Sequence, residues 1–246
     1  MQEYKYVKHS DKQRAFILEK AKELFLEQDI KDVSMSQIAQ QSNLMRATIY
    51  RYFENRDAIA WEIYIDFNKQ VNLMRQEKYR DRKLSTYEKI ALFLQNMADV
   101  FEELPDYYKF FFHFSKEYLN NKLYPDTRFT KELYETTGLT SGSTVAFLME
   151  DFHDGSVRED LDSKEFCVSL VYGTLGAIQI VNNNRDSLPL KYDLSALQVL
   201  KGILRGYLEA VKKDGYDHCC RRCNTAFISG AWYLELCRSM WDLKIS

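Results

Sequence analysis

The chain has 246 residues, 46% of them hydrophobic, which is enough to bury a sizeable core in one large or two modest domains. Its formal net charge of −2 excludes a histone-like protein that binds DNA through overall positive charge. Nine Gly and three Pro are few for this length, which favours helices over a turn-rich β fold.

The chain starts without the basic, apolar and small-residue segments of a secretory signal, so we expect a cytoplasmic protein. Residues 2–10, with Lys5, Lys8 and His9, are expected to form a mobile arm. This arm is either a disordered tail or a segment that touches DNA phosphates or the minor groove. Residues 11–28 are expected to form the first long helix. The side chains predicted on its core side are Phe16, Ile17, Ala21, Leu24 and Phe25.

Residues 34–53 (SMSQIAQQSNLMRATIYRYF) have the pattern of two short helices separated by a tight turn. Ser34 and Gln37 match a capping box at the start of the first helix, and Asn43 tolerates the left-handed conformation of a sharp turn. In the second helix Ile49 and Phe53 are predicted to point inward. The opposite face carries Arg46, Thr48, Tyr50, Arg51 and Tyr52. Such a face suits the DNA major groove, although a helical hairpin with a solvated polar face has the same pattern.

The neighbouring residues extend this pattern. Leu24-Phe25, Ser34-Met35, Ile38-Ala39, the run 48–53 and Asn55-Arg56 follow in order over the first quarter of the chain. This arrangement resembles the N-terminal domain of the TetR family of transcriptional repressors. The resemblance implies a regulator that binds a double-stranded DNA operator as a homodimer and responds to a small-molecule effector. The residues expected to contact DNA are Ser34, Arg46, Ala47, Thr48, Tyr50, Arg51, Tyr52 and Arg56.

The sequence also departs from the family pattern. Gly is usual in the family where this chain has Asp29, Asn43 and Ala47, Ser is usual at Met45, and Lys is usual at Arg56. Residues 1–56 contain ten Lys or Arg and eight Asp or Glu, so their net charge is +2, which permits a site-specific DNA-binding face. The departures motivate an alternative function, a TetR-like protein-binding adaptor or coactivator without sequence-specific DNA binding.

Two further helices are predicted in the middle of the chain. Residues 56–80 are expected to form a long helix that links the DNA-binding domain to the rest. A second helix is predicted for residues 86–103, ended by Pro105. Its apolar stripe consists of Ile90, Phe93, Leu94, Met97 and Phe101.

Residues 106–118 (DYYKFFFHFSKEY) are the most aromatic segment of the chain. A helix that is simply packed in the core explains these rings. The alternative is the wall of a pocket for an apolar or aromatic effector, and in TetR-like proteins the central helices enclose the effector site. The residues expected to line such a pocket are Phe101, Tyr107, Phe110, Phe111, His113 and Phe114.

A loop with Pro125 and helices at 127–137 and 140–153 are predicted before the uncharged segment 166–184. This segment approaches the length of a membrane span, but its Ser, Thr, Gln and Asn residues favour a helix covered by protein. Pro189 is expected to separate it from a last amphipathic helix at 193–213. Two such apolar helices are expected to meet their twins in a two-fold four-helix bundle, as the resemblance also implies. The residues expected at this dimer interface are Tyr172, Gly173, Gly176, Ala177, Ile180, Leu200, Ile203, Leu204 and Tyr207.

Residues 215–246 break the helical pattern and contain Cys219, Cys220, Cys223 and Cys237. Zinc binding, a redox thiol pair and an appendage outside the folded body are all compatible with this tail. No phosphate loop, nucleophile elbow or metal-ligand cluster is recognisable elsewhere, so we expect neither an enzyme nor a cofactor. We therefore predict an all-α protein with a helix-turn-helix domain at 1–56, a helical effector-binding and dimerisation domain at 57–214, and an atypical tail at 215–246.

Overall fold

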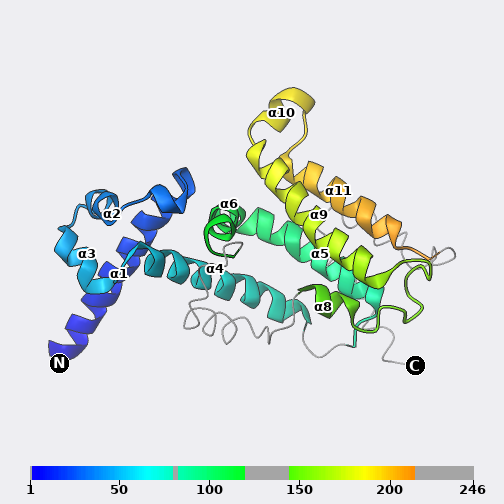
Figure 1. The fold of residues 1–246 in the computed structure, drawn as a ribbon, viewed down its shortest axis with the longest axis horizontal. Helices are drawn as coiled ribbons and strands as arrows, with labels where there is room; N and C mark the ends of the chain where they lie inside the picture. Colours follow the sequence, from blue (N-terminus) through cyan, green and yellow to red (C-terminus); the bar gives the residue numbers. More distant parts are fainter. Residues whose placement is uncertain (1, 80–82, 120–143, 214–246) are drawn as a thin grey trace. The chain divides into compact units, whose positions relative to one another are not determined.

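The computed structural model describes residues 2–79, 83–119 and 144–213. The elements in these ranges are helices (Figure 1). One isolated antiparallel bridge joins Val157 and Lys212. The chain forms two compact units. Unit 1 contains the described residues 2–79 and 103–119, and unit 2 contains 83–102 and 144–213. The predicted all-α fold with an N-terminal helix-turn-helix is confirmed.

Unit 1 begins with α1 (Gln2–Glu27), η1 (Ile30–Asp32), α2 (Met35–Gln41), α3 (Arg46–Tyr52) and α4 (Arg56–Tyr79). Ser34 starts α2 with the predicted capping box: its hydroxyl accepts from the backbone N–H of Gln37, and the Gln37 side chain accepts from the N–H of Ser34. The side chain of Asn55 accepts from the N–H of Ala58 at the start of α4 (2.8 Å). Polar side chains thus satisfy backbone N–H groups at the starts of α2 and α4.

The remainder of unit 1 is α6 (Pro105–Phe114) and the one-turn π-helix η2 (Ser115–Leu119). Phe110, Phe114 and Tyr118 are core residues of unit 1, and the partly buried Tyr107 and Phe111 pack against the same core. The ring centroids of Phe114 and Tyr64 are 4.1 Å apart, those of Phe114 and Trp61 are 4.9 Å apart, and those of Phe110 and Phe25 are 6.3 Å apart. These contacts explain why so many rings occur in one segment.

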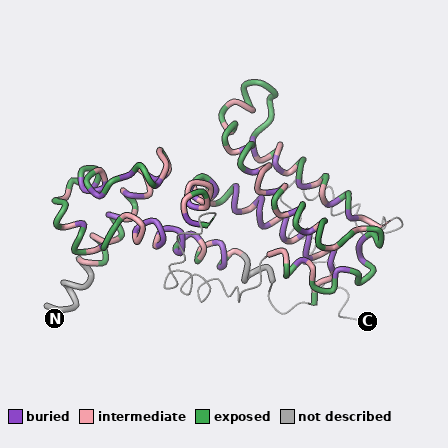
Figure 2. The backbone as a smooth tube through the Cα atoms, viewed as in Figure 1, coloured by how far each residue is buried: buried purple, intermediate pink, exposed green. Residues whose placement is uncertain are grey.

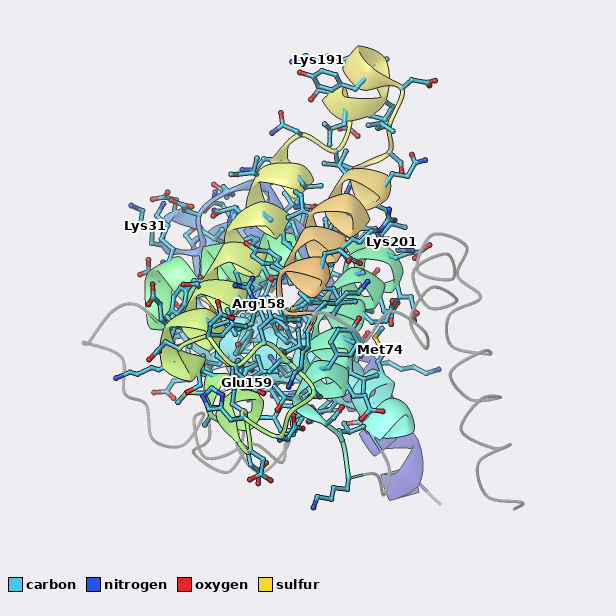
Figure 3. The ribbon with its side chains drawn as sticks, turned by 90° about the vertical axis from the view of Figure 1, so that its right-hand side faces the viewer. Lys31, Met74, Arg158, Glu159, Lys191 and Lys201 are labelled. Carbon is cyan, nitrogen blue, oxygen red and sulfur yellow. The ribbon has the colours of Figure 1, made fainter. Side chains whose placement is uncertain are left out.

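The helices of unit 2 are α5 (Thr86–Glu103, except its last residue), α8 (Thr144–Met149), α9 (Ser163–Asn183), α10 (Ser187–Tyr192) and α11 (Ala196–Ala210). All five residues of the predicted apolar stripe of α5 are buried. Asp162 caps α9, and Ser195 forms a capping box with Gln198 at the start of α11. The segment between α8 and α9 contains Glu159 (Figure 3), whose carboxylate pairs with Lys213 after α11 (2.6 Å). Local capping signals therefore set the starts of α9 and α11.

Several predicted boundaries are wrong. Residues 2–10 are continuous with α1 and are not a separate arm. Pro189 does lie between α9 and α11 as predicted, but within the short helix α10, which was not predicted. Phe16 is 41% exposed, because Ile17, Ala21 and Phe25, four residues apart, form the inward row of α1. The loop with Pro125, the predicted helix at 127–137 and the cysteine-containing tail lie outside the described residues.

Helix α9 is less covered than a core helix. It is long and apolar enough to cross a membrane by length and composition, and 28% of its most apolar 18-residue window is buried in this single chain. Figure 2 shows exposed stretches along α9 and an α10 that is largely exposed. Exposed apolar surface of this kind is typical of a contact with another protein or with a membrane.

Candidate nucleic-acid interface

The turn between α2 and α3 is a Schellman-type helix end. Asn43 has a φ of 51°, the left-handed conformation predicted for it. Its N–H donates to the carbonyl of Gln40 (3.0 Å), and the N–H of Leu44 donates to the carbonyl of Ala39 (2.9 Å). This turn reverses the chain between two helices of seven residues each.

Helix α3 has a buried side and an exposed side. Ile49 is fully buried and Phe53, directly after the helix, is 3% exposed. On the opposite side Arg46, Ala47, Tyr50 and Arg51 are exposed. A short helix that is buried on one side and carries cations and a phenol on the other has the form of a recognition helix.

Two exposed residues of this face form a pair. Arg46 Nη2 donates to the Tyr50 hydroxyl (3.2 Å), and the guanidinium lies 5.5 Å from the centre of the same ring. The two residues are four apart on α3, so one helical turn brings them together. The Tyr50 side chain thus holds the Arg46 guanidinium at the exposed surface of α3, where this cation is available to a phosphate or a base edge.

Two of the predicted DNA contacts are used inside the protein. The Tyr52 hydroxyl donates to Gln13 Oε1 on α1 (2.8 Å). Arg56 Nη1 donates to the carbonyl of Lys31 (2.6 Å), and its Nη2 donates to the Asp57 carboxylate (3.0 Å). Tyr52 and Arg56 thus contribute to holding the helices together. Ser34 is exposed and caps α2, and Thr48 is half-buried on α3.

A polar network joins α6 and η2 to the turn between α1 and α2. His113 Nδ1 lies 3.0 Å from the carbonyl oxygen of Gln28, and Lys116 pairs with Asp29 (2.6 Å). The hydrogen bond from Lys116 lowers the pKa of Asp29. The Tyr118 hydroxyl donates to the Asp57 carboxylate (2.8 Å). Burial and this hydrogen bond raise the pKa of Tyr118 well above its usual range, so its phenol stays a neutral donor.

The residues predicted to line an effector pocket belong to both compact units, and each is described within its own unit. Phe110 and Phe114 are fully buried core rings, and His113 contacts the α1–α2 turn. Tyr107 and Phe111 are partly buried and pack against the same core. Phe101 belongs to unit 2, where the guanidinium of Arg185 lies 4.2 Å from its ring centre. Sequence periodicity marks all these rings as apolar but does not separate core rings from pocket rings.

Unit 2 contains buried polar atoms that sequence reasoning missed. Asn96 on α5 is 1% exposed, and neither its amide oxygen nor its amide nitrogen has a hydrogen-bond partner. Thr174 on α9 is fully buried, and its hydroxyl is also unsatisfied. Buried polar groups are normally paired, so each of these sites is suited to a bound water or to a polar group of a ligand.

The predicted dimer residues divide into two groups. Tyr172 and Ile180 on α9 are 70% and 67% exposed, and Ile203 on α11 is 38% exposed. A Cβ added at Gly176 would meet no atom within 4 Å. Ala177 is half-buried. These residues lie on surface that a second subunit could cover.

The second group is used within the subunit. Leu200 and Leu204 are fully buried, because they form the inward row of α11. A Cβ added at Gly173 would lie 3.2 Å from Tyr207 Cζ, so Gly173 allows α9 and α11 to approach each other. The buried face of α11 therefore serves the subunit core, and its exposed face is what remains for a partner.

Catalytic and metal-binding features are not prominent. Within residues 2–79, 83–119 and 144–213, no group of three or more His, Cys, Asp or Glu side chains is placed to hold a metal ion. Cys167 is buried and unpaired, and burial raises the pKa of its thiol to about 11, which disfavours a reactive thiolate.

Residues 17–63 match the family model described as bacterial regulatory proteins, tetR family. The comparison with curated protein sequences gives no match. Among solved structures, the chain is similar to the ketosteroid transcriptional regulator KstR2 of Mycobacterium tuberculosis, with a TM-score of 0.61 and 16% identity, covering 82% of this chain and 95% of that one.

Two more structures have the same fold. A TetR-family regulator from Rhodococcus sp. has a TM-score of 0.54 and 13% identity, covering 81% of this chain and 98% of that one. FadR from Bacillus subtilis, solved in complex with stearoyl-CoA, has a TM-score of 0.52 and 18% identity, covering 80% of this chain and 98% of that one. These likenesses extend the similarity from the N-terminal domain to most of the chain.

Proposed function

The chain is a member of the TetR family of bacterial transcriptional regulators through its N-terminal domain, and from this premise we propose that it is a ligand-responsive repressor. It binds a palindromic operator in the cytoplasm as a homodimer and occludes a promoter. The observation that carries this proposal is the exposed face of α3, where Arg46, Tyr50 and Arg51 stand on a helix whose other side is buried.

The proposed homodimer rests on α9 and α11. Tyr172, Ile180 and Ile203 are exposed apolar side chains, and Gly176 leaves space beside them. A two-fold axis through this surface would bring two copies of α9 and α11 into a four-helix bundle. The same axis would present two recognition helices to half-sites about 34–36 Å, or a multiple of that distance, apart.

The proposed effector is a largely apolar molecule with at least one hydrogen-bonding group. Support comes from the unsatisfied polar atoms of Asn96 and Thr174 inside the apolar core of unit 2. Effector binding would favour a dimer whose half-site spacing does not match DNA, and α4 would transmit this change to the helix-turn-helix.

Selection from genomic DNA tests the DNA-binding role. The purified protein is mixed with genomic fragments, and the retained fragments are sequenced. We expect a short palindrome whose binding weakens as the salt concentration rises, because phosphate contacts release counterions. A folded dimer that retains no specific sequence would contradict this function and favour a protein-binding adaptor.

Effector response is tested on the selected palindrome with stearoyl-CoA as a first probe, chosen because FadR of Bacillus subtilis was solved with it. We expect release of the operator as stearoyl-CoA is added, and no release by coenzyme A without an acyl chain. Asn96→Leu, which replaces the unsatisfied amide by an apolar group of similar size, is expected to reduce the response. Release that is equal with both compounds would contradict an apolar effector.

A further inference from the structure

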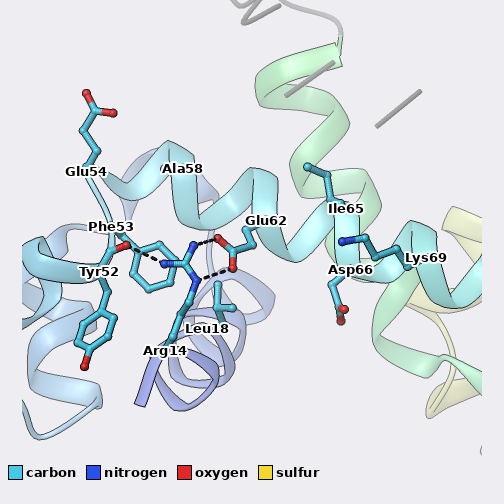
Figure 4. Close-up of a pocket in the computed structure, with 10 residues that line it drawn as sticks. All are labelled: Arg14, Leu18, Tyr52, Phe53, Glu54, Ala58, Glu62, Ile65, Asp66 and Lys69. Atoms are coloured by element: carbon cyan, nitrogen blue, oxygen red, sulfur yellow. Dashed lines mark hydrogen bonds and ion pairs between the residues drawn. The ribbon is translucent and has the colours of Figure 1, made fainter. Parts of the chain in front are cut away.

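Arg14 on α1 contacts both α3 and α4 in unit 1. Its Nε donates to Glu62 Oε1 on α4 (3.0 Å), and its Nη2 donates to the other oxygen of the same carboxylate. Its Nη1 donates to the backbone carbonyl of Tyr52, the last residue of α3 (2.8 Å). Figure 4 shows the guanidinium between Glu62 and this carbonyl, and its carbon lies 4.3 Å from the centre of the Phe53 ring.

The contact with Tyr52 matters because α3 has no side-chain cap at its other end. Helix α3 has seven residues, and Met45 at its N-cap supplies no side-chain hydrogen bond. At the C-terminal end the last carbonyls of a helix lack partners within the helix, and a cation there is attracted to the negative end of the helix dipole. Arg14 provides such a cation, and the hydroxyl of Tyr52 adds a second bond to α1 through Gln13. Helix α3 is therefore fixed from its C-terminal end.

Glu62 determines how the guanidinium of Arg14 is oriented. A carboxylate that accepts two parallel N–H bonds sets the plane of the guanidinium fork, and the remaining Nη1 then points to the Tyr52 carbonyl. Lysine has no such planar fork and cannot make both contacts in the same geometry. The orientation of α3 thus depends on the position of a residue on α4.

This pair is not well suited to a role in stability alone. The side chains of Arg14 and Glu62 are 39% and 32% exposed, and they line a pocket of about 510 Å³. Ion pairs that water reaches contribute little to folding, because solvent screens them. The arrangement instead fixes the position of the C-terminal end of α3, through the hydrogen bond from Arg14 to the Tyr52 carbonyl.

We propose that Arg14 is a positioning residue that sets the direction of the recognition helix, and that Glu62 couples this direction to α4. The inference rests on the proposed DNA-binding function. A displacement of α4 that moves Glu62 would turn the Arg14 fork and shift the C-terminal end of α3. The movement would change how well the exposed face of α3 fits its half-site without any change in the residues of that face.

The experiment compares Arg14→Met, Arg14→Lys and Glu62→Gln with the matched control Lys69→Met, which removes an exposed cation lining the same pocket. For each variant the dissociation constants for the selected palindrome and for a scrambled duplex are measured. Their ratio isolates sequence discrimination from the loss of one charge. Hydrogen–deuterium exchange of the backbone amides is followed in α2 and α3 of the same proteins.

Arg14→Met is expected to lower the discrimination ratio about tenfold, comparable to one mismatched base pair. The amides of residues 50–53 are expected to exchange faster, while α2 keeps its protection. Arg14→Lys and Glu62→Gln are expected to lie between this variant and wild type, because each keeps part of the contact set. Lys69→Met is expected to leave both the ratio and the exchange unchanged.

Two results would overturn the inference. One is an unchanged ratio in folded Arg14→Met protein. The other is faster exchange spread evenly over α2 and α3 with a lower melting temperature, which would make Arg14 a stability residue only. If wild type itself prefers no sequence, the proposed function fails. In that case the exchange pattern alone decides whether Arg14 holds α3.

Discussion

At the residue scale, the proposed recognition surface depends on Arg46 and Tyr50, which are joined by a hydrogen bond of 3.2 Å. The same surface excludes Tyr52 and Arg56, whose polar atoms bind other parts of unit 1. A residue type therefore indicates what a side chain can bind, but its neighbours determine whether the polar atoms are available to DNA.

Arg46→Ala is expected to weaken operator binding by about 1–3 kcal/mol, the usual range for a side chain that reads a base edge. Tyr50→Phe is expected to cause a smaller loss, because it removes the hydroxyl that accepts from Arg46 and leaves the ring. Fluorescence anisotropy with the selected palindrome measures both. Lys191→Ala on α10, which removes one exposed cation from unit 2, is the matched control. An Arg46→Ala affinity equal to that of the control would contradict the assigned face.

Met45 is an exception to ordinary helix capping. It is 80% exposed at the N-cap of α3 and makes no side-chain hydrogen bond to the helix. Met45→Ser is expected to raise the free energy of unfolding by about 1 kcal/mol relative to Met45→Ala, because the introduced hydroxyl accepts from a free backbone N–H. Urea denaturation followed by circular dichroism compares the two variants. Equal stability of the two would show that α3 gains nothing from a cap.

At the element scale, segments distant in sequence stabilise individual helices. The Asp154 carboxylate, after α8, accepts from the backbone N–H of Thr86 at the start of α5 (2.8 Å). It also accepts from the N–H (2.9 Å) and hydroxyl (2.6 Å) of Ser156. Burial raises the pKa of Asp154, but these hydrogen bonds to Ser156 and Thr86 outweigh that effect, so its pKa is lowered overall.

Asp154→Ala is therefore expected to lower the free energy of unfolding by about 1–2 kcal/mol at pH 7, as loss of an N-cap does. The pKa of Asp154 is lower in the folded protein than in the unfolded chain. Its contribution to the free energy of unfolding is therefore complete above the unfolded pKa of about 3.9, and it is lost as the pH falls through the folded-state pKa. The difference in free energy of unfolding between wild type and Asp154→Ala should therefore become smaller below about pH 4. Chemical denaturation at pH 7 and pH 3 measures it. A difference that is the same at both pH values would contradict the carboxylate cap.

The contacts of α6 and η2 are also decided at this scale. Three side chains from these helices, His113, Lys116 and Tyr118, bind the α1–α2 turn or the start of α4. Helix α6 therefore belongs to the same compact unit as the helix-turn-helix. A predicted domain boundary at residue 56 stays a prediction, and the compact units suggest that α4 and α6 be kept with residues 1–56 in any truncated variant.

At the scale of the whole molecule, the proposed dimer explains the exposed apolar side chains of α9. Ile180→Glu is expected to convert the dimer to a monomer at micromolar concentration, because a partner would have to bury an unpaired carboxylate. Operator affinity is expected to fall as well, since one subunit reads only one half-site. Light scattering after size-exclusion chromatography measures the mass.

The control for this prediction is Leu73→Glu, which introduces the same charge at a 64% exposed apolar residue of α4 in unit 1. It is expected to leave the dimer intact. A dimer that survives Ile180→Glu, or that is lost equally in both variants, would contradict an interface centred on α9 and α11.

The sequence by itself determined the all-α class, the α2–turn–α3 motif and the family resemblance. These follow from signals within a few residues of each other: helical periodicity, the Ser34–Gln37 capping box and the left-handed Asn43. The sequence also predicted which side chains of a helix are buried, as the five buried residues of the apolar stripe of α5 show.

Only the tertiary structure decided how particular side chains are used. Arg14 and Glu62 are 48 residues apart, and no local pattern indicates that they pair. The aromatic rings of α6 could line a pocket or fill a core until the position of α4 against them was known. Leu200 and Ile180 look equally apolar in sequence, yet one is fully buried and the other is 67% exposed. The physical reason is that hydrogen-bond partners and burial depend on packing between helices, whereas periodicity and capping depend on neighbours along the chain.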